Sequence, residues 1–242
     1  MRKQTKLVDC GATVFVYDFQ CSGSEVKELR FERDVFNGNI TNMKRLLLTN
    51  FVNDILLATF CLRISLNEYE KVTDILNQFV RHLKRSSGHH DMKYLAVTKP
   101  SSDKNEDHAY ILLITDIEIY ELTNALDDDI TEDQEEEYFE GIWGDELFID
   151  VYSPGELIET FTSAYKKSLK INILEKFPKS FRNNLLQPSV LWNKEADTFI
   201  NNHNFSKYPV HQSYEVYDNS SGFIKINEYS LYDTSSCTEE WD

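Results

Sequence analysis

The order in which apolar strands and amphipathic helices follow one another limits the possible folds more than any other feature of this chain. Apolar runs typical of buried strands alternate with segments whose apolar residues recur at helical spacing. The predicted strands are residues 55–66, 92–98, 108–119 and 146–152, and the predicted helices are residues 38–52, 67–85, 121–126 and 153–170. This order predicts an α+β fold, with an antiparallel central sheet and helices packed mainly on one face of it.

The two ends of the chain are predicted as additions to this core. We expect a single domain of residues 1–242, with its core at about residues 44–170, an N-terminal strand extension at 1–43 and a C-terminal extension at 171–242. The C-terminal extension is predicted to combine a helical region, Phe177 to Asn204, with the strand–turn–strand sequence YEVYDNSSGFIKINEY.

Two further features concern the environment of the protein. No apolar run approaches the roughly 18 residues that a membrane-spanning helix needs, so we expect a cytoplasmic protein without membrane contact. The cysteines are widely scattered without a C-x-x-C pair, which favours thiols in a reducing compartment over a zinc site or a disulfide framework. They are Cys10, Cys21, Cys61 and Cys237.

The negative charge of the chain is concentrated in one segment. The formal net charge is −16, yet the segment from Asn105 to Tyr165 holds 19 acidic residues and no lysine or arginine. The remaining residues carry 22 acids against 25 bases. Non-specific DNA binding requires lysine and arginine to neutralise phosphates, so this segment can contribute little to it. A solvated acidic face is the plain interpretation, and a surface for a basic partner is the other.

Several stretches resemble one known family in their order and spacing. NMKRLLLTNFVNDILLATFCL has a basic helix, then Asn-Phe, then a first core strand. FVRHLKR, MKYLAVTK and DHAYILLI follow as a helix and two strands, and GIWGDELFIDVY and FTSAYKKSLK come later. NNLLQPSVLW and YEVYDNSSGFIKINEY resemble the trailing segments. The chain thus resembles, over nearly its whole length, the rolling-circle replication initiators of plasmids and phages from Gram-positive hosts, which are HUH endonucleases.

The resemblance implies a particular chemistry. In that family two histidines one residue apart on a strand point to the same face and, with a carboxylate, hold a divalent cation. A helix tyrosine then attacks the scissile phosphate and forms a phosphotyrosine link, while a nearby lysine neutralises developing charge. The resemblance assigns the metal position to His108 and the nucleophile position to Tyr165, followed by Lys166 and Lys167.

The sequence departs from this pattern at two of the three metal-ligand positions. Tyr110 stands where the second histidine is expected, and a phenol with an unperturbed pKa of about 10 is a poor ligand at neutral pH. Lys99 stands at the carboxylate position and would repel a cation. We therefore expect no cofactor and no catalysis. The alternative is a divergent nickase that uses Mn²⁺ or Mg²⁺, with Glu106 or Asp107 as a substitute carboxylate and Tyr165 as nucleophile; otherwise Tyr165 is an ordinary tyrosine on a helix flank.

The lost ligands and the acidic segment together predict a non-enzymatic protein of a mobile element in a bacterial host cell. We expect the segment to bind the nucleic-acid groove of a basic partner, such as a CRISPR effector nuclease, as an inhibitor of the anti-CRISPR or another anti-defence type, without direct DNA binding. Aromatic residues among the acids would anchor the contact. The predicted partner-binding residues are Asp127, Asp128, Asp129, Glu132, Asp133, Glu135, Glu136, Glu137, Tyr138, Phe139, Glu140, Trp143, Asp145 and Glu146. A third hypothesis is a regulatory remnant that pairs with an active initiator.

Overall fold

The computed structural model of the chain consists of two compact units. One unit is formed by Met1–Thr49 together with Leu186–Asp242, and the other by Asn50–Leu185. The structure describes residues 2–11, 13–21, 38–52, 57–65, 71–101, 108–118, 147–150, 152–169, 180–208, 210–218 and 222–230. Within these residues, no helix has both the length and the apolar character that crossing a membrane requires. Helices and antiparallel sheets occur in both units, which confirms the α+β class.

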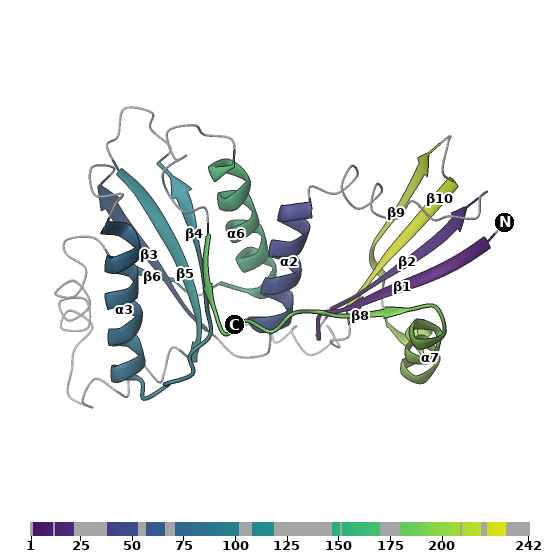
Figure 1. The fold of residues 1–242 in the computed structure, drawn as a ribbon, viewed down its shortest axis with the longest axis horizontal. Coiled ribbons are helices and arrows are strands. Elements are labelled where there is room, and N and C mark those ends of the chain that lie inside the picture. Colours follow the sequence, from purple (N-terminus) through teal and green to yellow (C-terminus); the bar gives the residue numbers. More distant parts are fainter. Residues whose placement is uncertain are drawn as a thin grey trace, which may run out of the picture. The chain divides into compact units, whose positions relative to one another are not determined.

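The second unit contains a five-stranded antiparallel sheet in the order β6-β3-β5-β4-β7 (Figure 1). Its strands are β3 (Leu57–Ser65), β4 (Tyr94–Pro100), β5 (His108–Glu118), β6 (Leu147–Asp150) and β7 (Ser180–Asn183). Strand β5 lies in the middle, paired with β3 on one side and β4 on the other. The four strands predicted for the core are therefore all present in this sheet.

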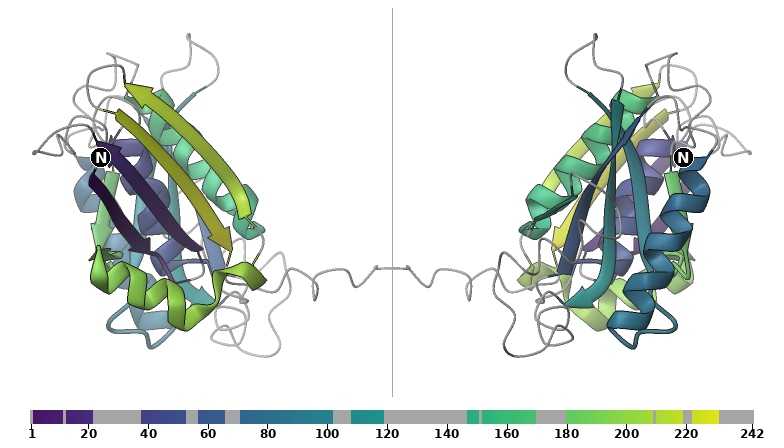
Figure 2. Two further views of the ribbon diagram at one scale, coloured as in Figure 1. Left: turned by 90° about the vertical axis from the view of Figure 1, so that its right-hand side faces the viewer. Right: turned by 90° about the vertical axis from the view of Figure 1, so that its left-hand side faces the viewer.

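Helices α3 (Val72–Ser86) and α6 (Pro154–Ser168) lie on opposite sides of this sheet (Figures 1 and 2). Strand β5 is buried on both faces from Ile111 to Thr115, so each face needs an apolar cover. The sequence predicts helices mainly on one face of the central sheet. The arrangement in this unit differs because a strand that is apolar on both sides cannot leave one of them in water.

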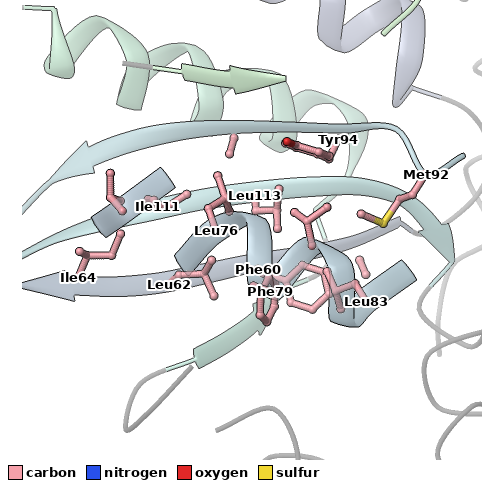
Figure 3. Packing of buried hydrophobic residues seen from close by; sticks show 14 of the residues in the cluster. Phe60, Leu62, Ile64, Leu76, Phe79, Leu83, Met92, Tyr94, Ile111 and Leu113 are labelled. Carbon is pink, nitrogen blue, oxygen red and sulfur yellow. The ribbon is translucent and has the colours of Figure 1, made fainter. Parts of the chain in front are cut away.

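The core of the second unit lies between α3 and the sheet (Figure 3). Alternate residues of the strands point toward α3, whose buried positions recur at helical spacing. Phe60 of β3 and Phe79 of α3 meet edge to face, with ring centroids 5.3 Å apart. The buried α3 residues are Val72, Leu76, Phe79, Val80 and Leu83, which are the apolar positions expected of an amphipathic helix.

Helix α6 begins as its sequence predicts. Ser153 is the N-cap and Pro154 occupies the first turn. The Ser153 hydroxyl accepts from the Glu156 amide, and the Glu156 carboxylate accepts from the Ser153 amide at 3.0 Å, which completes a capping box. The side chain and backbone of Ser153 lower the pKa of the Glu156 carboxyl below its ordinary value of 4.5.

The first unit joins the two ends of the chain in one five-stranded sheet, in the order β8-β1-β2-β10-β9. Its strands are β1 (Arg2–Asp9), β2 (Thr13–Cys21), β8 (Ser189–Trp192), β9 (Val210–Asp218) and β10 (Gly222–Ser230). The predicted strand–turn–strand is confirmed as β9 and β10, and β10 pairs with β2 rather than standing alone as a hairpin. The N-terminal and C-terminal extensions, which were predicted as separate, thus form backbone hydrogen bonds with each other in one sheet.

The helical region predicted from Phe177 to Asn204 is wrong over much of its length. Within it, β7 pairs with β4 and β8 pairs with β1, and of its described residues, 180–204, only those of α7 (Lys194–His203) form an α-helix. Pro188 lacks the amide hydrogen that a continuous helix would need. α7 and the following 3-10 turn η3 (Phe205–Lys207) bury Ala196 and Phe205 against β1 and β2.

Helix α2 (Gly38–Asn50) contacts strands β10 and β2 of the first unit through two charged side chains. The Lys44 ammonium lies 3.0 Å from the Glu228 carboxylate on β10, and the Arg45 guanidinium donates to the Tyr17 hydroxyl on β2. Cys10 is a buried free thiol beside this sheet, and burial raises its pKa to about 11. Its thiol therefore stays protonated at neutral pH, as expected of a structural cysteine.

We predict that Ser153→Ala lowers the free energy of unfolding by about 1 kcal/mol, because the Glu156 amide loses its acceptor. The exposed Ser163→Ala change in the same helix is the matched control and should stay within about 0.5 kcal/mol of the parent. Urea denaturation followed by circular dichroism measures both. Because the folded-state pKa of Glu156 is lowered, its contribution is present above pH 4.5 and is lost as the pH falls through the lowered pKa. The Ser153 hydroxyl also donates to the Glu156 carboxylate at 2.7 Å, so this part of the cost of Ser153→Ala should disappear in acid, while the part from the Glu156 amide remains. A cost for Ser153→Ala no larger than that for Ser163→Ala would contradict the capping box.

Candidate functional site

The sheet face under α6 changes from apolar to cationic toward one end. Directly paired residues of antiparallel strands point to the same face, so the register defines rows of side chains. Two rows of this face, one around Ile114 and one around Leu112 of β5, are apolar at their centre. The buried apolar residues of α6 are Leu157, Phe161 and Ala164. The next row consists of Arg63 on β3, Tyr110 on β5 and Lys99 on β4. We call these three residues the polar row.

His108 lies beyond the polar row on the same face and is 7% exposed. One Arg63 guanidinium nitrogen lies 3.1 Å from its Nδ1, and the Tyr110 hydroxyl lies 3.1 Å from its Nε2. An arginine can only donate, so Nδ1 accepts and the ring proton is on Nε2. Nε2 then donates to the Tyr110 oxygen. The Lys99 ammonium lies 6.0 Å from the centre of the Tyr110 ring.

This arrangement does not fit the divalent cation that the family resemblance implies. A histidine binds a metal through a nitrogen lone pair, and the one lone pair of the His108 ring already accepts from Arg63. Arg63 and Lys99 both bring positive charge to Tyr110. In the described ranges, no three His, Cys, Asp or Glu side chains form a group that could hold a metal ion. The substitute carboxylates of the nickase hypothesis, Glu106 and Asp107, lie outside the described residues.

Helix α6 brings Tyr165 toward the same end of the sheet. β6 runs antiparallel to β3 and ends opposite Thr59, after which the chain turns into α6. From Pro154 to Tyr165 the helix rises about 16 Å, while β3 advances about 14 Å from Thr59 to Arg63. Since α6 lies along the strands (Figure 1), its last turn lies toward the end of the sheet that holds the polar row. Tyr165 is half-buried beside the apolar stripe, and Lys166 and Lys167 are exposed in the last turn.

The predicted partner-binding residues, from Asp127 to Glu146, lie outside the described residues. Of the acidic segment, the structure describes β5 (His108–Glu118) near one end and residues 147–150 and 152–165 at the other. The acidic partner surface therefore rests on the sequence, where the carboxylates and aromatic residues are consecutive.

Arg63 is the site residue that sequence reasoning missed. It is the one charged residue in the strand LATFCLRIS, which reads as a buried strand with a single exception. Such an exception is a usable indication of a polar contact, but its partner depends on strand register. The register that pairs Arg63 with Tyr110, and Ser65 with His108 two residues further along, is a tertiary property.

Comparison of the chain with models of protein families, with curated protein sequences and with solved structures gives no match.

We predict that the parent protein shows no saturable Mn²⁺ binding, and that the triple change Arg63→Gln, Lys99→Glu and Tyr110→His creates it. The triple variant releases the His108 lone pair from the Arg63 guanidinium and supplies a carboxylate and a second imidazole on the same face. Isothermal titration calorimetry and the Mn²⁺ electron paramagnetic resonance signal measure the binding. Tyr110→Phe, which adds no ligand, is the control. Equal Mn²⁺ binding by the parent and the triple variant would contradict the assignment of the face.

Proposed function

We propose that the chain is a catalytically inactive protein derived from a replication initiator, which binds the nucleic-acid groove of a basic partner and inhibits it. The inhibition would be of the anti-CRISPR or another anti-defence type. The proposed absence of catalysis is supported by the hydrogen bonding of His108, whose two ring nitrogens lie beside Arg63 and Tyr110. A side chain held in this way has no lone pair to offer a metal, and the metal is the group that would polarise a scissile phosphate in the resembled family.

The charge distribution supports a protein partner rather than DNA. From Asn105 to Tyr165 the sequence has 19 carboxylates and no lysine or arginine. Such a segment repels a phosphate backbone and attracts a groove lined with lysine and arginine. The run EEEYFEGIW places three aromatic residues among these carboxylates. Aromatic side chains are the usual anchors of protein interfaces, because they bury large areas at a low cost in conformational entropy.

We predict that the protein binds basic nucleases in a salt-sensitive manner and that charge reversal in the segment weakens this binding. Changing Asp127–Asp129, or Glu135–Glu137, to lysine should reduce affinity at least tenfold, since each lost charge pair contributes on the order of 1 kcal/mol or more. Purified nucleases with basic grooves, titrated at two salt concentrations and assayed for cleavage, provide the measurement.

A matched triple reversal outside the segment controls for net charge. Asp91, Glu195 and Asp197 are exposed and lie outside residues 105–165. Their change to lysine alters the formal charge of the chain by the same amount and should leave binding nearly unchanged. Equal weakening by the control and the segment variants would mean that net charge, and not the segment, drives association.

The second candidate function is a divergent tyrosine nickase of single-stranded DNA. Its support is the place of Tyr165 near the end of α6, where Lys166 and Lys167 follow it in the last turn. A nickase would form a covalent phosphotyrosine adduct.

The adduct assay separates the two functions. Incubation of the protein with labelled single-stranded DNA and Mn²⁺, followed by a denaturing gel, is expected to show no adduct. An adduct that survives Tyr208→Phe in the first unit and is abolished by Tyr165→Phe would establish the nickase and end the inhibitor proposal.

A further inference from the structure

The polar row brings two cations to either side of one phenol. Arg63 and Lys99 both pair with Tyr110 in register, so their side chains leave the sheet on one face, about 10 Å apart at the backbone. Both side chains are long enough to meet over the ring between them. In the described part of the chain Lys99 forms no ion pair, and its ring contact is with Tyr110. A face that repels a metal cation is suited to an anion.

The hydrogen bonds in this cluster run in one direction. Arg63 donates to Nδ1 of His108, and Nε2 of His108 donates to the Tyr110 oxygen. The Tyr110 proton therefore points to an acceptor other than His108. Successive donors polarise one another, so a cation at the head of the chain makes the phenol at its end a better donor. The guanidinium thus acts on an acceptor at Tyr110 both by its charge and through the imidazole.

The surroundings strengthen the electrostatic effect. His108 is buried and Lys99 and Tyr110 are half-buried, so their interactions are screened less than those of exposed groups. Lys166 and Lys167 in the last turn of α6 come to the same end of the sheet. The cations Arg63, Lys99, Lys166 and Lys167 lie outside the segment 105–165, which has no lysine or arginine, whereas His108 and Tyr110 lie within it.

We infer that the polar row and His108 form a binding site for a phosphate group that needs no metal ion. A phosphate presents oxygens in several directions, so one group can accept from Arg63, from the Tyr110 hydroxyl and from Lys99 at once. The planar guanidinium binds two phosphate oxygens side by side, and the ammonium acts as a point charge. The two oxygens of a carboxylate lie in one plane and match these three donors less well. This inference does not rest on the acidic segment or on its partner.

Titration of the full-length protein with inorganic phosphate in the presence of EDTA tests the site. Isothermal titration calorimetry gives the affinity, and amide shifts in ¹H–¹⁵N spectra give the location, which we expect at the ends of β3, β4 and β5. A 5′-mononucleotide forms the second arm. Tighter binding of the nucleotide identifies a nucleotide ligand, and equal binding identifies the phosphate group alone; both results support the site.

Arg63→Gln and Lys99→Gln should each weaken phosphate binding at least tenfold, the loss expected for a hydrogen bond to a charged group. Both positions are exposed or half-buried, and circular dichroism checks that the variants fold. Arg81→Gln is the matched control, because Arg81 is exposed on α3, across the same sheet. The inference is overturned if phosphate binding is not saturable at millimolar concentrations, or if the three variants bind alike. Either result leaves the partner-binding proposal intact.

Discussion

Strand β5 is the constraint on which the second unit depends. It lies between β3 and β4 and is buried on both faces from Ile111 to Thr115, so one helix must cover each side. α3 covers the face that holds Phe60, which contacts Phe79 of α3, and α6 covers the other. Burial on the α6 face becomes incomplete at Tyr110. The length of the apolar run in one strand therefore decides where polar chemistry can begin.

The charges of the polar row determine whether this face of the sheet suits a metal cation or an anion. On the face where the resembled family holds a cation, Arg63 and Lys99 stand on either side of Tyr110, and His108 accepts from Arg63. Electrostatics then disfavours a metal and favours an anion, whatever the history of the fold. The proposed partner surface has the opposite sign and a different position in the sequence.

Local patterns predicted most of the individual elements correctly. The helical spacing in α3, the cap at Ser153 and the pairing of β9 with β10 each depend on neighbours close in the sequence, and each is present. The predictions failed where pairing partners lie far apart. Residues 180–183 and 189–192 form strands because β4 and β1 supply hydrogen-bonding partners, and no local pattern identifies such partners. The union of the two chain ends in a single sheet was missed for the same reason.

The sequence by itself determined the α+β class, the apolar faces of the strands and helices, the place of the negative charge, and the presence of Lys99 and Tyr110 where the resemblance would require metal ligands. These properties depend on residue type and short-range spacing. Only the tertiary structure decided that Arg63 bonds to His108, that Arg63 and Lys99 share a row with Tyr110, and that α6 covers the face of the sheet opposite α3. Strand register and the direction in which α6 returns across the sheet create these contacts, since a shift of one residue would turn every side chain of the row to the opposite face.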